Sequence, residues 1–311
     1  MNMSVRSRVQ RALVFTVLPI AAIAMSTEVS AEQTKIQRYA QEIGASERVN
    51  YSGKLRMLSQ KIVASSCNFA AGIDAEISSK AMQATKAEFE LVADALEHGN
   101  PDLGIFGEEK RKKTRASITR LRDQWAPVVA DLNGITNDPK AANQAVASLA
   151  VNSELLLDNA KLLVSDLLAQ YSDPSIMTQA DAIRIDISGR QRMLTQRMSK
   201  NVCLLASGVG GDTATAELAA TAEMFETSLL ALRGGFMEAG INPPPNENIA
   251  KHLQIVAEDW EALKPAVQAV LSGTDLSPTD RAVVFHGMNE MTADMNTVVG
   301  LYVEASKHGT M

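Results

Sequence analysis

Two segments of the chain place an arginine in closely similar sequence settings. Arg56 lies in SGKLRMLSQK, which begins at Ser52, and Arg192 lies in SGRQRMLTQR, which begins at Ser188. The guanidinium group is charged at any ordinary pH, and its planar fork of N–H donors matches a small planar oxyanion. The chemistry that this pair of residues could provide is therefore the binding of an anion.

Both segments are predicted to be helical, with the arginine on a face separate from the core. At about 100° per residue, the apolar residues around Arg56 cluster roughly 130° away from it, which is the side expected to face a helical bundle. The face near the arginine is polar or small, and it recurs in the second copy. Its members are Ser52, Arg56, Gln60, Val63 and Cys67 in the first copy and Ser188, Arg192, Gln196, Ser199 and Cys203 in the second.

We interpret this polar face as the contact between the two copies. Gly53 and Gly189 lie beside it, and a glycine inside a helix costs about 1 kcal/mol relative to alanine unless another backbone must come close. Two arginines that meet across such a contact repel each other unless an anion lies between them, which predicts one shared anion site. The alternative is that both arginines are simply solvated. The predicted ligand-binding residues are Arg56, Arg192, Gly53, Gly189, Ser52 and Ser188.

The two cysteines fall on the same face as the arginines. Cys67 lies 11 residues after Arg56, and Cys203 lies 11 residues after Arg192. Eleven residues make about three helical turns, so each cysteine points within roughly 20° of its arginine. Parallel packing of the two helices therefore predicts that the cysteines lie close together, with a disulfide if their Cα atoms come within about 7 Å. The alternative is that both are small buried core residues.

The rest of the chain indicates an all-α fold built by duplication. Helix-favouring residues dominate and strand signals are nearly absent. Ten of 26 positions are identical when Arg48 to Ile73 is aligned with Arg184 to Val209. We therefore predict two tandem four-helix bundles that form a pseudo-dimer.

Glycines, prolines and capping residues set the expected helix limits. Asp74, Asn246 and the sequence Ser277-Pro278 are typical of helix N-termini. The first four helices are expected over about 33–71, from Asp74 to Gly99, over 108–132, and from Asp138-Pro139 to about 171. The other four are expected up to Gly208, from Asp212 or Thr213 to Gly240, from Asn246 to about 271, and from Pro278 onward.

The first 31 residues have the pattern of a secretory signal peptide. A basic start is followed by an apolar run over 12–25 and by the small residues Val-Ser-Ala, which end at Ala31. The run is short for a membrane span, and no later segment is apolar for long enough to be one. We expect cleavage after Ala31 and a soluble periplasmic product; an uncleaved anchor is the alternative. The expected domains are 1–31 (signal peptide), 32–173 (first repeat) and 174–311 (second repeat).

Composition argues against several other classes of function. The formal net charge of −6 disfavours nucleic acid as a general partner. The four histidines have no metal-ligand spacing, and no nucleophile–base pair or spaced pair of catalytic carboxylates is evident. We therefore expect no enzyme activity, no cofactor and no metal site.

The duplicated segment resembles a known family. The sequences VNYSGKLRMLSQKI and IDISGRQRMLTQRM are similar to the first-helix signature of the PilJ-type domain, the N-terminal sensor domain of type IV pili methyl-accepting chemotaxis transducers. They also resemble the nitrate-binding segment of NarX-type sensor kinases. In those sensors the arginine after the glycine comes from both subunits of a dimer and holds one nitrate between parallel helices. The resemblance implies that role for Arg56 and Arg192, with Gly53 and Gly189 allowing the approach.

These observations lead to two functional hypotheses. The first is a periplasmic binding or sensor protein for a small inorganic anion, with nitrate or nitrite favoured, that acts through a membrane receptor or sensor kinase. The second is a helical adaptor that binds no ligand and docks on a membrane chemoreceptor, a sensor kinase or a pilus component. The symmetry of Arg56 and Arg192 favours the first.

Overall fold

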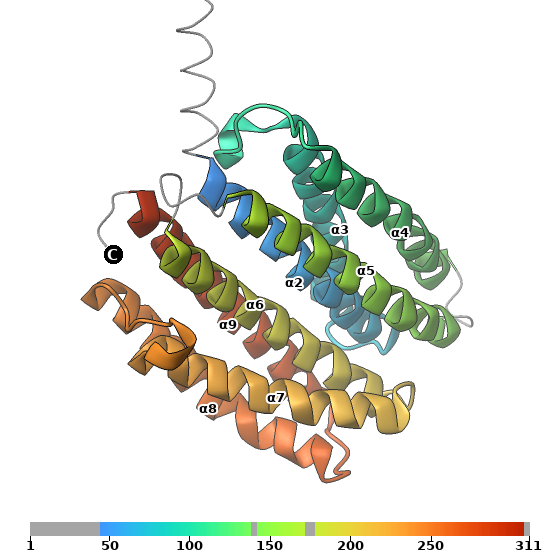
Figure 1. The fold of residues 1–311 in the computed structure, drawn as a ribbon. Helices are drawn as coiled ribbons and strands as arrows, with labels where there is room; N and C mark the ends of the chain where they lie inside the picture. Colours follow the sequence, from blue (N-terminus) through green and yellow to red (C-terminus); the bar gives the residue numbers. More distant parts are fainter. Residues whose placement is uncertain (1–43, 138–141, 172–177, 308–311) are drawn as a thin grey trace, which may run out of the picture. The chain divides into compact units, whose positions relative to one another are not determined.

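The computed structural model describes residues 44–137, 142–171 and 178–307. Within these ranges the chain forms α-helices and two short 3-10 helices but no β-strand, so the predicted all-α class is confirmed (Figure 1). The helices are α2 (Ala45–Ala70), α3 (Ala75–His98), η1 (Pro101–Leu103), α4 (Lys112–Asn137), α5 (Ala142–Gln170), α6 (Gln179–Ala206), α7 (Gly211–Gly234), η2 (Met237–Ala239), α8 (Glu247–Leu271) and α9 (Pro278–Lys307).

The eight α-helices of the described ranges follow one plan twice. Both ends of α7 lie 136 residues after those of α3, and η2 follows η1 by the same offset. In Figure 1 the blue-to-green helices α2–α5 form one group, and the yellow-to-red helices α6–α9 form another beside it. All of them belong to one compact unit, Ala40–Met311. The duplication seen in the sequence is therefore a duplication of structure.

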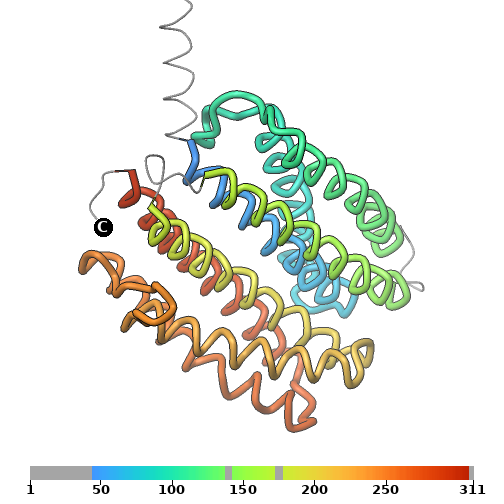
Figure 2. Tube along the Cα trace, in the orientation of Figure 1, coloured from blue at the N-terminus to red at the C-terminus, as the bar shows by residue number. Residues whose placement is uncertain are grey.

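The first helices of the two repeats are the central helices of the unit. α2 packs against α3 and α5 of its own repeat and against α6 of the other, while α6 packs in turn against α7 and α9. The Cα trace in Figure 2 shows α2 (blue) and α6 (yellow) lying between the outer helices. Because neighbours surround them, both helices bury polar as well as apolar residues. The apolar face seen in the sequence is therefore buried together with the polar face that carries the arginines.

Each repeat has its own aromatic anchor in the core. Phe89 stacks on Trp125 with ring centroids 3.9 Å apart, and Phe225 meets Trp260 at 5.2 Å. Both tryptophan N–H groups donate to a glutamate one residue beyond the phenylalanine. Paired rings of this kind add to the stability that burial alone provides.

Three predicted helix limits are wrong, and loop contacts explain two of them. α4 ends at Asn137 rather than near residue 132. It begins at Lys112 rather than near residue 108, because the carbonyl groups of Phe106 and Gly107 accept hydrogen bonds from Arg48 and the segment stays outside the helix. α7 ends at Gly234 rather than Gly240. The chain leaves α7 through Gly235, whose φ is 82°, and then forms a bridge that encloses η2.

The predicted N-terminal signals gave mixed results. The side chain of Asn246 accepts a hydrogen bond from the N–H of Ile249, and Ser277 accepts one from the N–H of Asp280, so α8 and α9 begin as expected. Asp74 precedes α3, but its side chain makes no capping hydrogen bond.

Several predictions concern parts of the chain that the structure does not describe. The signal peptide, the beginning of the first expected helix and Asp138-Pro139 all lie outside the described residues.

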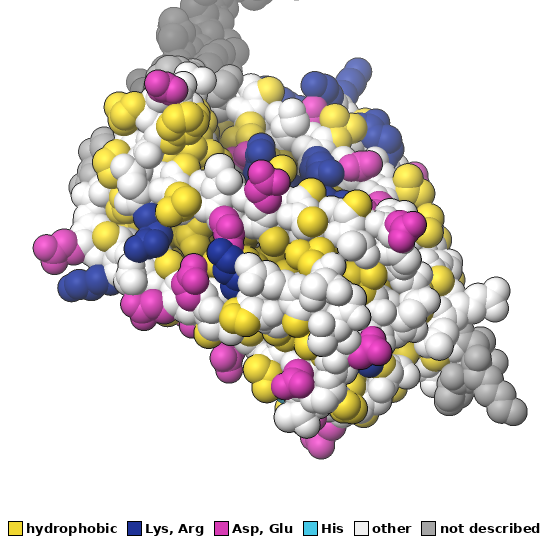
Figure 3. All heavy atoms as spheres, turned by 90° about the horizontal axis from the view of Figure 1, so that it is seen from below, with side chains coloured by type: hydrophobic (Ala, Val, Ile, Leu, Met, Phe, Trp, Pro, Cys, Tyr) yellow, Lys and Arg dark blue, Asp and Glu magenta, His cyan; other side chains and the backbone are white. Residues whose placement is uncertain are grey.

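No described helix has an apolar stretch long enough to cross a bilayer. The face in Figure 3 mixes charged side chains of both signs with apolar ones.

Candidate functional site

The site begins with the close approach of α2 and α6. Gly53 lies on α2 and Gly189 lies on α6, each one residue after a fully buried serine. A Cβ atom at Gly53 would lie 3.3 Å from Nη2 of Arg56 and 3.5 Å from Nη2 of Arg192. A Cβ atom at Gly189 would lie 3.2 Å from Nη2 of Arg192 and 3.5 Å from Nη2 of Arg56. The two glycines therefore leave the space in which both guanidinium groups meet.

Arg56 has a carboxylate partner from the other repeat. Its Nη1 atom lies 2.8 Å from Oδ1 of Asp186 on α6, and its Nη2 atom donates to the main-chain carbonyl of the same residue. The other carboxylate oxygen of Asp186 pairs with Arg190 at 2.8 Å. Arg56 is only 4% exposed, so this ion pair is buried. One carboxylate thus serves two arginines.

Arg192 has neutral partners instead. Its Nη1 atom donates to the side-chain oxygens of Asn50, at 3.0 Å, and Asn296, at 2.9 Å, while Nη2 donates to the main-chain carbonyl of Asn50. Within the described ranges no carboxylate lies at ion-pair distance from Arg192, which is 2% exposed. The Nε atoms of both Arg56 and Arg192 are buried and have no hydrogen-bond partner among the described residues.

The electrostatics of the pair are unfavourable without a counterion. Burial, followed by the neighbouring charge of Arg56, lowers the pKa of Arg192 to about 9. Burial also lowers the pKa of Arg56, although Asp186 opposes this effect. A lowered pKa of a cationic group means that the folded protein disfavours its charged form. An anion between the two guanidinium groups would relieve that cost.

The cysteines close the same helix contact three turns further on. Cys67 and Cys203 are joined by a disulfide with their Cα atoms 6.1 Å apart, as the sequence analysis predicted for parallel helices. Arg56 and Cys67 on α2 face Arg192 and Cys203 on α6 in the same order, so α2 and α6 run parallel. The alternative of two separate core cysteines is therefore wrong.

The two predicted serines lie at the contact, but their hydroxyl groups are already engaged. Ser52 donates to the carbonyl of Val49, and Ser188 donates to that of Arg184, in each case within its own helix. Both serines are fully buried. Their visible contribution is a small side chain that allows close packing.

Sequence reasoning missed the asparagine partners of Arg192. Asn50 is the counterpart of Asp186 at the 136-residue offset, and this difference between the copies was readable in the alignment. Asn296 comes from α9, about a hundred residues away in sequence, and no pattern pointed to it. The two arginines were found because they repeat, whereas their partners do not.

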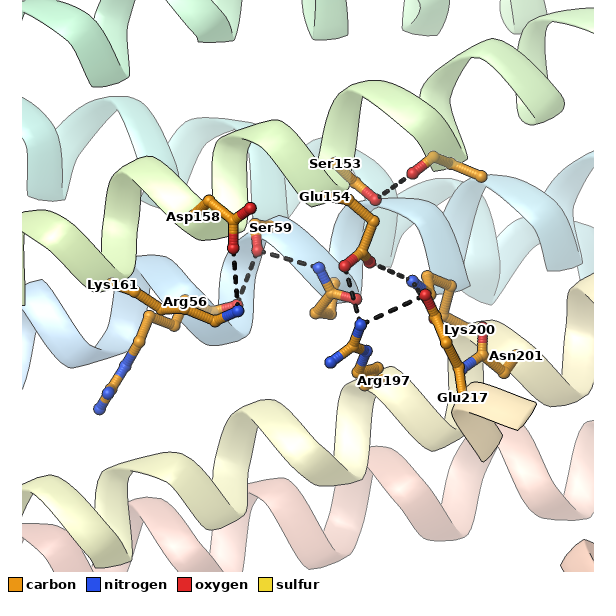
Figure 4. Close-up of polar contacts among 12 residues, drawn as sticks. Arg56, Ser59, Ser153, Glu154, Asp158, Lys161, Arg197, Lys200, Asn201 and Glu217 are labelled. Atoms are coloured by element: carbon orange, nitrogen blue, oxygen red, sulfur yellow. Dashed lines mark hydrogen bonds and ion pairs between the residues drawn. The ribbon is translucent and has the colours of Figure 1, made fainter. Parts of the chain in front are cut away.

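A second polar cluster joins the repeats next to this site. Figure 4 shows Glu154 on α5 reaching toward Arg197 and Lys200 on α6, with Glu217 of α7 on the other side. Lys200 is 2% exposed and lies 2.5 Å from Glu154 and 3.4 Å from Glu217. Arg197 contacts the same two carboxylates. Ala64 occupies the position of Lys200 in the first copy, so the cluster has no symmetric twin.

The fold and this contact define a duplicated helical domain with paired arginines between its two halves. The family of Type IV pili methyl-accepting chemotaxis transducer N-terminal domains (PilJ) matches residues 39–151 and 177–283. The chain belongs to this family, and the two matched segments agree with two tandem copies. No curated protein matches the chain in a sequence search.

The family places the chain among the N-terminal, helical domains of chemotaxis transducers, a class of sensing domain without catalysis. Within the part of the chain that the structure describes, no group of histidine, cysteine and acidic side chains could hold a metal ion. The arrangement at the contact can attract and orient an anion.

Proposed function

We propose that the protein binds a small oxyanion between Arg56 and Arg192. The observation that supports this most is the convergence of the two Nη2 atoms at Gly53 and Gly189, with one of the two arginines lacking a carboxylate partner in the described ranges. A planar oxyanion could accept from both guanidinium forks at once. Nitrate and nitrite are favoured because both are small, planar and singly charged, which suits two planar guanidinium groups.

The proposed role is that of a periplasmic binding or sensor protein. Its leader-like N-terminus supports export, and membership of a chemotaxis-transducer family supports a signalling partner such as a membrane receptor or sensor kinase. Release of the protein by osmotic shock, with an N-terminus at Glu32, would support this location. Recovery only in washed membranes, with residues 1–31 still attached, would contradict it.

Calorimetric titration of the purified protein tests the ligand directly. Nitrate and nitrite should bind with one site per chain, and sulfate and chloride should bind more weakly or not at all. At 100-fold excess over its dissociation constant, a ligand should stabilise the fold by about 2.7 kcal/mol. The Arg192→Gln variant should lose this response while remaining folded. Absence of binding by all four anions to the folded protein would reject the proposal.

An adaptor that binds no anion is the second candidate. Phe236 and Met237 follow α7 and are 50% and 70% exposed, so two adjacent large apolar side chains lie at the surface, where a partner could cover them. Leu230, which lies on α7 six residues before Phe236, is also exposed. Failure of anion binding, together with loss of receptor capture in a Met237→Ser variant, would favour this reading.

A further inference from the structure

A groove opens between the two repeats on the side where Arg56 meets Asp186. It lies where α5 of the first repeat faces α6 and α7 of the second, and its volume is about 430 Å³. Its apolar wall is formed by Val164, Leu168, Met193, Leu194 and Met224.

The polar part of the groove is strongly basic. Four cations and one carboxylate line it, and a single serine completes the polar set. Arg190 and Lys161 have side chains that are 53% and 47% exposed, so they lie at the mouth, while Arg56 is buried at the inner end. Figure 4 shows Lys161 on α5 and Arg197 on α6. The lining cations are Arg56, Lys161, Arg190 and Arg197, and the carboxylate is that of Asp186.

The four cations have carboxylate partners to different degrees. Arg56 pairs with Asp186, and Arg197 contacts both Glu154 and Glu217, so the cations left for a ligand are those at the mouth. Lys161 pairs with Asp158, which is 71% exposed, and water screens a pair this exposed. Among the described residues, the carboxylate that pairs with Arg190 is that of Asp186, which Arg56 also uses. A second carboxylate at the mouth would therefore find two accessible cations.

The lining of the groove differs from the corresponding place in the first repeat. Met224 is the counterpart of Glu88, and Arg190 is the counterpart of Lys54. In the first repeat Glu88 forms an ion pair with Lys54. Met224 cannot pair with Arg190, and its apolar side chain lines the groove instead. The second repeat therefore has an apolar side chain, Met224, at the position where the first repeat has the carboxylate that pairs with Lys54.

Size and chemistry together select the class of ligand. A volume of about 430 Å³ falls within the roughly 300–1,000 Å³ of small-molecule sites and is far larger than an inorganic oxyanion needs. An inorganic anion would also leave the apolar wall uncovered. A divalent cation is disfavoured because the carboxylate that lines the groove, that of Asp186, already pairs with Arg56 and Arg190.

We propose that this groove binds a small organic monocarboxylate, with the carboxylate on Arg190 and Lys161 and a compact apolar body against Leu168, Met193 and Met224. The site is separate from the one proposed between Arg56 and Arg192, although Arg56 borders both, and it does not depend on nitrate binding.

Titration of the purified protein with hexanoate, and with hexanamide as its neutral counterpart, tests the proposal. Hexanoate should bind with one site per chain, and hexanamide at least tenfold more weakly. Met224→Glu should weaken hexanoate binding at least tenfold, because it places a carboxylate beside Arg190 as Glu88 lies beside Lys54. Leu230→Glu is the matched control, since Leu230 lies on the same helix, is 66% exposed and does not line the groove.

Three results would overturn the proposal. They are the absence of hexanoate binding, equal binding of hexanoate and hexanamide, and equal losses in the Met224→Glu and Leu230→Glu variants. Both variants change exposed positions, since Met224 is 53% exposed, so the fold should persist and circular dichroism can check it. The nitrate response, which the Arg192→Gln variant removes, should survive in Met224→Glu, so failure of one site can be told from failure of the other.

Discussion

The two repeats carry the same arginine at the same place but surround it differently. Arg56 of the first repeat has the carboxylate of Asp186, whereas Arg192 of the second has the amides of Asn50 and Asn296. A symmetric dimer of identical chains cannot make this distinction, because every substitution appears in both halves. Duplication within one chain allows one arginine to be neutralised while the other keeps its charge for a ligand.

The largest expected effect concerns the bond that holds the two repeats in register. Cys67→Ser should lower the free energy of unfolding by about 4–5 kcal/mol, because the disulfide with Cys203 closes a loop of more than a hundred residues. Urea unfolding of the wild-type and variant proteins measures the difference. Two free thiols in the unfolded, unreduced wild-type protein would contradict the disulfide itself.

The next largest effect is a difference in stability between variants of Arg56 and variants of Arg192. Arg56→Gln should destabilise the unliganded protein by about 2 kcal/mol, since the buried carboxylate of Asp186 then keeps only its partly exposed partner Arg190. Arg192→Gln should change the stability by less than about 1 kcal/mol or raise it, because it removes a buried charge that Arg56 repels. Chemical unfolding without anion compares the two. Equal losses of stability in the two variants would show that Arg56 and Arg192 do not differ in how their charges are neutralised.

Much of this arrangement was predictable because it repeats. The identity of the segments around Arg56 and Arg192 predicted the paired helices, and the equal spacing to Cys67 and Cys203 predicted the disulfide. Features that break the repeat were not predictable. Lys200 binds glutamates from two other helices, and neither partner leaves a periodic signal in the sequence.

Loop geometry was also beyond sequence reasoning. The segment before α4 stays outside the helix because buried Arg48 on α2 donates to its carbonyl groups, a contact across almost sixty residues. Helix propensity alone extended α4 into that segment. A single buried guanidinium that satisfies main-chain acceptors can outweigh the weak local preference for helix.

Glycine substitutions test whether the space at the contact serves the arginines. Gly53→Ala and Gly189→Ala should leave the stability within about 1 kcal/mol of wild type, because the helix gain from alanine is offset by crowding against Nη2 atoms at 3.3 and 3.2 Å. Both should weaken nitrate binding, since the guanidinium groups must move. Gly300→Ala in α9 is the control: nothing lies within 4 Å of its Cβ position, so it should stabilise the protein without affecting nitrate. Unchanged nitrate binding in both variants would show that Gly53 and Gly189 are not needed for the anion site.

The smallest expected effect is a pH dependence confined to the second repeat. Asp259 on α8 lies beside Asp294 on α9, and burial, followed by the Asp294 charge, raises the pKa of Asp259 to about 6. At the corresponding place in the first repeat, Asp158 pairs with Lys161 instead. A carboxyl group with a raised folded-state pKa binds its proton more tightly in the folded protein, so stability is lost as pH rises from about 4 to about 6.

The loss should be of order 1 kcal/mol, because solvent screens a partly exposed group. Asp259→Asn should remove it, so that the variant becomes the more stable protein above pH 6 while the two proteins converge near pH 4. Thermal melts across this range, with Asp158→Asn as the matched change in the first repeat, provide the measurement. Asp158→Asn should not gain stability above pH 6, because it removes a partner of Lys161 rather than a repelled charge. If both variants shifted alike, the acidic pair would not distinguish the repeats, and the contrast between them would be limited to the arginine contact.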